Sequence, residues 1–155
     1  MLLDPTQCFA GFRPGFLLRS LPVLVRPRAA RVLAYLDRET AGTDTDPDWK
    51  RLFALAAAGF ADRKLVLGRR PDAGALRAPL LLLLAGRSGA HDPGKVAARA
   101  RAAVPHARIE ALPHLTHYAL PTAAPAETNR VICAFLEADR GDGGDRNDRT
   151  AGPTA

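Results

Sequence analysis

Cysteine is scarce in this sequence, and its scarcity limits both covalent and metal chemistry. Cys8 and Cys133 are the only cysteines among 155 residues, and they stand far apart in the chain. Two distant thiols form neither a disulfide framework nor a metal-ligand pattern. We therefore expect buried, reduced thiols in a cytoplasmic protein.

A long apolar segment is also missing. No run approaches the roughly 18 apolar residues that a membrane-spanning helix needs. The start, Met1–Asp4, lacks the basic residues, apolar core and cleavage site of a signal peptide. We expect no membrane partner.

The usual motifs of several site classes are absent as well. The sequence has no Gly-rich phosphate loop, no His-x-x-x-His pair and no Cys-x-x-Cys. We predict neither a cofactor nor a metal. The net charge is +6, but the arginines are scattered and no nucleic-acid motif accompanies them, so we expect no nucleic-acid partner.

The most informative stretch runs from Ala78 to Pro121. The five leucines Leu80–Leu84 lie between Pro79 and Gly86 and predict a strand covered on both faces. Asp92 and Pro93 then form the N-cap and first position of a helix that ends near Val104. A second strand is predicted over 107–112. Strand, helix and strand in this order predict an α/β fold with a parallel sheet.

The remaining segments predict a further strand, several helices and a tail. Residues 1–4 are apolar and strand-like, and Asp46-Pro47 repeats the Asp-Pro helix start. A helix is predicted from about Pro125 to Ala138. Residues 139–155 carry no large apolar side chain, so we expect a disordered tail. An aromatic and apolar stripe on the predicted helix after Asp46 is typical of core packing and could alternatively line an acyl pocket: Trp49, Leu52, Phe53, Ala56 and Phe60.

Several of these segments together resemble a known family. The runs are "APLLLLLAGRSGAHDPGKVAARARAAVPHARIEALPHLTHYALP", the closing "ETNRVICAFLEA" and the opening "MLLDPTQCFAGF". Their order and spacing are similar to the C-terminal part of an α/β-hydrolase, closest to the carboxylesterase and lipase-like members. The resemblance implies a strand at 1–9, a helical cap at 10–77 and a hydrolase core of about three parallel strands at 78–138. It implies a small-molecule ester or acyl substrate.

The resemblance also implies residues for a catalytic histidine and its acid. His117 in "PHLTHYALP" matches the histidine that follows the last strand, and His114 fits less well; His91 and His106 we interpret as surface residues. The family most often places its acid where Ser88 stands here. Asp4 and Asp92 are the two replacements, and we prefer Asp4, because some members carry the acid after the preceding strand and Asp92 already caps a helix.

The family's nucleophile has no counterpart. Ser20 and Ser88 are the only serines, and neither lies in a Gly-x-Ser-x-Gly elbow. We therefore expect a truncated hydrolase that is inactive alone, because it lacks the serine and the oxyanion hole. Two alternatives stay open: a non-catalytic binding or interaction module derived from a hydrolase cap, and a truncated reading frame with no selected function.

The missing half also predicts a surface property. In the family's strand order, the strand at residues 1–4 would lie next to a central strand that this sequence lacks. We expect an open sheet edge there, loss of the helices that cover Leu80–Leu84, and self-association through the edge.

Overall fold

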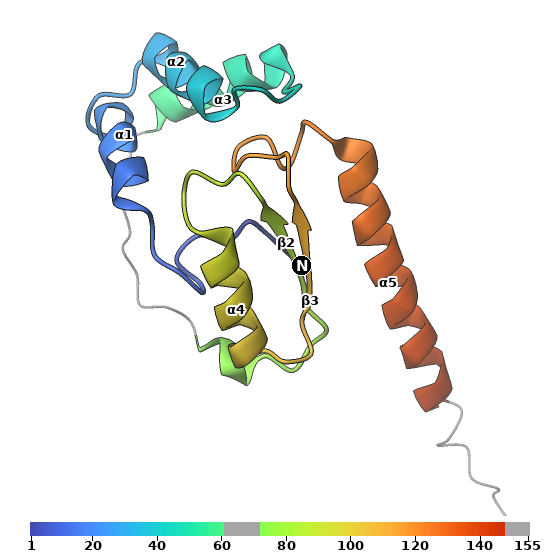
Figure 1. Cartoon of the computed structure of the whole chain (residues 1–155). Coiled ribbons are helices and arrows are strands. Elements are labelled where there is room, and N and C mark those ends of the chain that lie inside the picture. Colours follow the sequence, from blue (N-terminus) through green and yellow to red (C-terminus); the bar gives the residue numbers. More distant parts are fainter. Residues whose placement is uncertain (61–71, 148–155) are drawn as a thin grey trace, which may run out of the picture.

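The fold is built around a small parallel sheet. The computed structural model describes residues 1–60 and 72–147 (Figure 1). Its strands are β1 (Leu2–Leu3), β2 (Leu81–Ala85) and β3 (Arg108–Leu112), in the spatial order β1-β2-β3. Both strand pairs are parallel, so the predicted α/β fold with about three parallel strands is confirmed.

The central strand β2 is covered on both faces, as its unbroken leucine run predicts. Leu82 and Leu84 pack with residues of helix α4 (Pro93–Ala103). Leu81 and Leu83 pack with Val131 and its neighbours on helix α5 (Pro125–Asn147). The expectation that this run loses its covering helices is therefore wrong, because α4 and α5 both come from the chain's own C-terminal part.

Two helices begin at the predicted Asp-Pro pairs. The Asp92 carboxylate accepts the backbone N–H of Lys95 at 3.0 Å, at the start of α4. The Asp46 carboxylate accepts the N–H of Asp48 at 2.8 Å, at the start of α3 (Pro47–Gly59). In both helices the proline stands where no intrahelical N–H is needed, so the local sequence alone fixes these starts.

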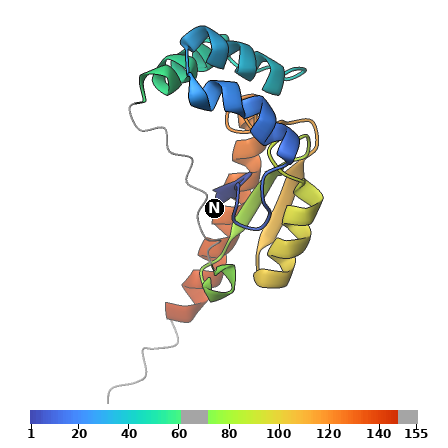
Figure 2. The same ribbon diagram turned by 90° about the vertical axis from the view of Figure 1, so that its left-hand side faces the viewer.

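Three helices form a layer beyond the carboxyl ends of the strands (Figures 1 and 2). They are α1 (Pro14–Val25), α2 (Ala29–Glu39) and α3. The predicted stripe on α3 is only partly correct, because Leu52 is 68% exposed and Phe60 is 66% exposed. The predicted cap region, 10–77, also contains the short 3-10 helix η1 (Ala73–Ala75), and its residues 61–71 lie outside the described residues.

The C-terminal helix is longer than the sequence predicts. It begins at Pro125 as expected but continues to Asn147 instead of ending near Ala138. A helix once started adds one backbone hydrogen bond per residue, so it can continue past its last buried side chain. The expected disorder from residue 139 is therefore wrong as far as Asn147, and residues 148–155 lie outside the described residues. Among the described residues, none of the helices combines the length and apolarity needed to cross a membrane.

Gly86 allows the strand ends to approach closely. Its N–H donates to the carbonyl of Leu112 at 2.9 Å. A Cβ atom at this position would lie only 2.5 Å from the Cα of Pro113, a backbone atom that cannot move aside easily. Glycine is therefore required where the loops after β2 and β3 meet, directly below the functional site described next.

The exposed edge of β1 leads to a first prediction. β1 forms one edge of the sheet within the described part of the chain, and its Leu3 is 37% exposed. Because an apolar strand edge pairs readily with other chains, we expect the 155-residue chain to elute above its monomer mass of 16.5 kDa. Leu3→Lys should shift it towards the monomer in size-exclusion chromatography with light scattering.

The matched control is Leu136→Lys, because Leu136 is 47% exposed but lies on α5 rather than on β1. It should leave the elution unchanged. A wild-type chain that is monodisperse at 16.5 kDa would show that the β1 edge does not drive association.

Candidate functional site

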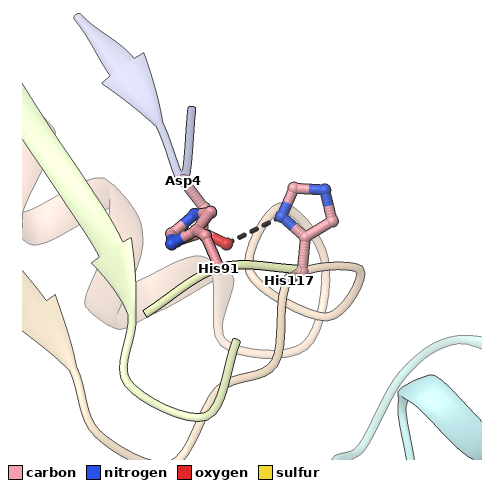
Figure 3. Close-up of side chains that lie close together, drawn as sticks. All are labelled: Asp4, His91 and His117. Carbon is pink, nitrogen blue, oxygen red and sulfur yellow. Dashed lines mark hydrogen bonds and ion pairs between the residues drawn. The ribbon is translucent and has the colours of Figure 1, made fainter. Parts of the chain in front are cut away.

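A cluster of ionisable side chains lies where the three strands end (Figure 3). Asp4 follows β1 directly, His91 lies between β2 and α4, and His117 follows β3. The carboxyl ends of parallel strands meet at one edge, so three distant parts of the sequence arrive at the same place. Ligand atoms of these three residues all lie within 4.8 Å of one another.

The Asp4 carboxylate is the centre of the cluster. Asp4 is 1% exposed, and each of its carboxylate oxygens has close polar neighbours in the protein. Oδ1 accepts the backbone N–H of Ala85 at 3.1 Å and lies 3.1 Å from His91 Nε2. Oδ2 accepts the Ser88 hydroxyl at 2.8 Å and lies 2.7 Å from His117 Nδ1. These neighbours make the buried charge tolerable.

The backbone of Asp4 is in the left-handed region, with φ at 40°. Non-glycine residues adopt this region uncommonly, and aspartate tolerates it better than most. The Asp4 N–H donates to the Leu83 carbonyl at 2.7 Å, which continues the pairing with β2 up to this residue. The turn therefore starts at Asp4 itself, and the side chain leaves the strand at the point where it meets the two histidines.

The surroundings favour the ionised form of Asp4. Burial alone would raise the pKa of this carboxyl group. The hydrogen bond from His117, the close approach and charge of His91 and the Ser88 hydroxyl outweigh burial, so the pKa lies well below its ordinary value. Asp4 is thus an anion throughout the neutral range.

His117 has one nitrogen committed and one available. Its Nδ1 faces Asp4, while the side chain remains 23% exposed. Within the described residues, Nε2 makes no hydrogen bond. The ring packs edge-on against Tyr118, with 5.1 Å between ring centroids, and against Phe16 of α1 at 6.4 Å. An imidazole held this way can exchange a proton at Nε2 with a group in the adjoining space.

Tyr118 connects the histidine to the helical layer. Its ring meets Tyr35 of α2 and Phe53 of α3 edge-on, at centroid distances of 5.7 and 5.9 Å. Burial raises the pKa of the Tyr118 hydroxyl well above its ordinary value, and the neighbouring Tyr35 and Glu39 add to the increase. Tyr118 is therefore a neutral packing residue rather than a proton donor in the neutral range.

The structure places the two candidate acids differently. Asp4 contacts His117, whereas the Asp92 carboxylate caps α4 and faces the Arg13 guanidinium at 3.8 Å. Ser88, which stands where the resemblance implies an acid, donates its hydroxyl to Asp4. The preference for Asp4 thus agrees with the geometry, and the catalytic roles of Asp4 and His117 stay predictions.

Of the other three histidines, two lie outside the cluster. His114 lies 3.3 Å from Glu127, and His106 is exposed near the carbonyl of Ala78. His91 was expected at the surface, and that expectation is wrong, because it is 0% exposed. No local pattern marks it: "GAHDP" reads as a polar loop before a helix, and the covering residues come from other parts of the chain.

The residue types in the cluster allow two kinds of chemistry. One carboxylate and two imidazoles form a set that can bind a divalent metal. The same groups, without an ion, form an acid–histidine pair for proton transfer. The short contact between Asp4 and His117 and the occupied carboxylate favour proton transfer, because a metal would have to displace hydrogen bonds already in place.

Comparisons with solved structures identify the fold. Carboxylesterase CesB from Bacillus subtilis matches with a TM-score of 0.65 and 18% identity, over 83% of this chain and 47% of that one. Naproxen esterase (carboxylesterase NP) from Bacillus subtilis matches with a TM-score of 0.63 and 19% identity, over 84% and 49%. No family model and no curated protein matches the sequence. The chain has part of an α/β-hydrolase fold and spans about half the length of the solved structures that it matches.

The burial of Asp4 leads to a second prediction. Asp4→Ala would leave buried donors without an acceptor, so we expect it to lower the free energy of unfolding by about 3–5 kcal/mol. Asp92→Ala removes only an exposed helix cap and should cost much less. Urea unfolding followed by circular dichroism measures both. Equal losses in the two variants would contradict the central role of Asp4.

The pH dependence of this effect follows from the lowered pKa of Asp4. The stability from the ionised carboxylate is present above the unfolded-state pKa of about 3.9. It is lost as the pH falls through the lower pKa of the folded state. The difference in stability between wild type and Asp4→Asn should therefore shrink as the pH falls below about 4.

Proposed function

We propose that Asp4 and His117 are the acid and base of an acyl-transfer hydrolase that acts on an ester or a similar small acyl compound. The observation that carries the proposal is the 2.7 Å contact between His117 Nδ1 and the buried Asp4 Oδ2, at the carboxyl edge of a hydrolase-type sheet. Fold likeness alone would not be enough, because one fold can host unrelated functions.

In the proposed mechanism Asp4 fixes the state of His117. The carboxylate accepts a hydrogen bond from the protonated Nδ1 of His117. Nε2 is then free to accept a proton from a nucleophile. As His117 becomes an imidazolium, the negative charge of Asp4 stabilises it. His117 then returns the proton to the leaving group. Asp4 stays ionised through this cycle, which agrees with its lowered pKa.

The nucleophile and the oxyanion donors are proposed to come from residues outside this sequence. The Ser20 hydroxyl donates a hydrogen bond to the Phe16 carbonyl at 2.8 Å and shares a second one with the Tyr35 hydroxyl at 3.0 Å, inside the helical layer. Ser88 bonds to Asp4, on the Nδ1 side of His117 rather than at Nε2. Neither serine occupies the position that a nucleophile activated by Nε2 requires.

The substrate class rests on the surroundings of His117 and on the fold. The imidazole packs edge-on against two aromatic rings, Phe16 of α1 and Tyr118 of the loop after β3. Aromatic side chains beside the reacting group suit small organic esters. Two of the structural neighbours are named as carboxylesterases, which supports the same class.

A second candidate function is a non-catalytic binding module. The observation in its favour is a set of exposed apolar side chains on the helical layer, since such patches often mark interaction sites. They are Leu18, Leu21, Val25, Leu52, Leu55 and Phe60. This candidate explains the helical layer but gives no reason for a buried, ionised Asp4 next to His117.

The third prediction concerns the 155-residue chain by itself. We expect no serine-dependent hydrolysis of short-chain p-nitrophenyl esters, because loss of the serine costs about 10⁶-fold in turnover in a hydrolase of this mechanism. The chain should also take up no fluorophosphonate probe. Turnover that the probe abolishes would show that Ser20 or Ser88 acts as a nucleophile after all.

The fourth prediction tests the roles of the acid and the base. The coding DNA upstream of Met1 is read in frame, and the longer product is expressed if it contains a Gly-x-Ser-x-Gly segment. In that product His117→Ala should reduce kcat to background, and Asp4→Asn should reduce it far more than Asp92→Asn. Asp92→Asn is the matched control, because it makes the same change at an acid outside the cluster.

Two outcomes would contradict the proposed roles. Full turnover by His117→Ala would exclude His117 as the base. Loss of turnover in Asp92→Asn, with Asp4→Asn near wild type, would reverse the choice of acid. An in-frame upstream reading without the serine segment, together with ligand capture by the helical layer, would favour the binding module.

A further inference from the structure

His91 is a buried ionisable residue that the proposed catalysis leaves without a role. It is 0% exposed, and its Nε2 lies 3.1 Å from Asp4 Oδ1. It comes from the loop before α4, whereas His117 approaches the opposite oxygen of the same carboxylate from the loop after β3. Asp4 therefore has two imidazole neighbours, one wholly buried and one partly exposed.

The contact between His91 and Asp4 is mainly electrostatic. Among the described residues, neither ring nitrogen of His91 has a hydrogen-bond partner of good geometry, although Nε2 is close to the carboxylate. A charge–charge attraction depends less on angle than a hydrogen bond does, and it is strong away from water. A neutral imidazole would gain little from this position, while an imidazolium gains the attraction of a buried anion.

The groups around His91 favour its charged form. Burial lowers the pKa of His91, but the Asp4 carboxylate and the backbones of Asp4 and Asp92 outweigh burial, so the net change is upward. The other facing ring is His117, with 6.4 Å between centroids. Charged groups on or next to the same loop include two opposite-sign pairs, Arg13 with Asp92 and Arg19 with Glu39. Arg87 of the loop itself is exposed and donates to the Ala41 carbonyl at 3.4 Å.

We propose that His91 is a positioning residue that, as an imidazolium, serves as the buried counter-charge of Asp4 and limits how much of the Asp4 charge acts on His117. When His91 carries its proton, the carboxylate is shared between two imidazoles. When His91 loses the proton, the whole negative charge is available to His117. Only this effect on His117 rests on the proposed function; the ion pair itself does not.

A metal site is the rival interpretation of the same three residues. An ionised carboxylate offers about four lone-pair positions. Asp4 already has four close neighbours, namely the Ala85 N–H, the Ser88 hydroxyl, His91 and His117. A metal would have to displace at least one of them from a buried site, so the observations favour the ion pair.

The first test measures the proton on His91 directly. The ring signals of the four histidines are followed by NMR from pH 5 to pH 9, and His91 is assigned by its absence in His91→Gln. We expect His91 to titrate above about 6.5, the ordinary value. In Asp4→Asn, burial acts without the carboxylate, so the midpoint should fall below about 6.5. A wild-type midpoint at or below that value would overturn the proposal.

The second test measures stability against pH and needs no enzymatic activity. Folding raises the pKa of His91. The contribution of protonated His91 to the free energy of unfolding is therefore fully present below about pH 6.5 and is lost as the pH rises through the folded-state pKa. In that window the folding equilibrium constant of the wild type should fall by up to tenfold per pH unit. His91→Gln keeps a donor for Asp4 but no charge, so it should lose this slope and approach the wild type at high pH.

Controls separate this effect from simple packing. His106→Gln makes the same change at an exposed histidine and should keep the wild-type slope. His91→Phe keeps a buried ring without any donor, so it should be destabilised at every pH. A slope that persists in His91→Gln would overturn the proposal, because the proton would then belong to another group. If His91→Gln fails to fold, the signal missing from His91→Phe assigns His91, and the wild-type and Asp4→Asn titrations then decide.

Zinc tests the rival interpretation. Isothermal titration of the wild-type chain with Zn²⁺ should show no stoichiometric binding that depends on His91. Binding of one Zn²⁺ that His91→Gln abolishes would establish a metal site and overturn the ion pair. Failure of the proposed hydrolase would look different, since the longer product would lack turnover while the titration of His91 stayed as expected.

Discussion

The burial of one negative charge determines how this site is built. A carboxylate that is 1% exposed has exchanged its hydration for protein neighbours, and such a charge is costly unless those neighbours are donors or cations. Asp4 has them from three parts of the chain: the end of β2, the loop before α4 and the loop after β3. These segments must therefore converge whenever the protein is folded, and Gly86 leaves the space that their approach requires.

The helical layer depends on the same region through aromatic contacts rather than charge. His117 touches Tyr118, and Tyr118 touches Tyr35 and Phe53 on two different helices. Edge-on aromatic pairs contribute about 0.5–1.5 kcal/mol each beyond their buried area. A displacement of α2 or α3 would therefore move Tyr118 and, through it, the imidazole of His117. The position of the helices and the orientation of His117 are parts of one packing arrangement.

Local chemistry made much of the fold predictable from the sequence. At Asp46 and Asp92, the capping hydrogen bond that starts the helix forms within three residues of the Asp-Pro pair. The unbroken leucine run of β2 predicts by itself that the strand is buried on both faces. The pairing of Asp4 with His117 was predictable for a different reason: parallel strands bring their carboxyl ends together, and the family resemblance identified which loops matter.

The remaining features depend on parts of the chain that are distant in sequence. His91 lies in a loop with no apolar periodicity, and its sequence gives no sign that Asp4 and His117, from distant loops, lie against it. The exposure of Leu52 and Phe60 is the opposite case, because an amphipathic stripe is buried only where a partner surface covers it. The extension of α5 to Asn147 follows from backbone hydrogen bonding, which residue composition does not report.

A hydrogen bond joins Ser88 to Asp4, and its chemistry explains why a serine suits this position. The Ser88 hydroxyl donates to Asp4 Oδ2 at 2.8 Å, from the place where the hydrolase resemblance implies the acid. A carboxylate at both positions would bring two like charges together in a buried site, and one of them would have to stay protonated. Serine avoids this conflict, because it is small, neutral and able to donate. For Asp4 to be the acid, as proposed, the side chain at the position after β2 must therefore be uncharged, and Ser88 meets that requirement.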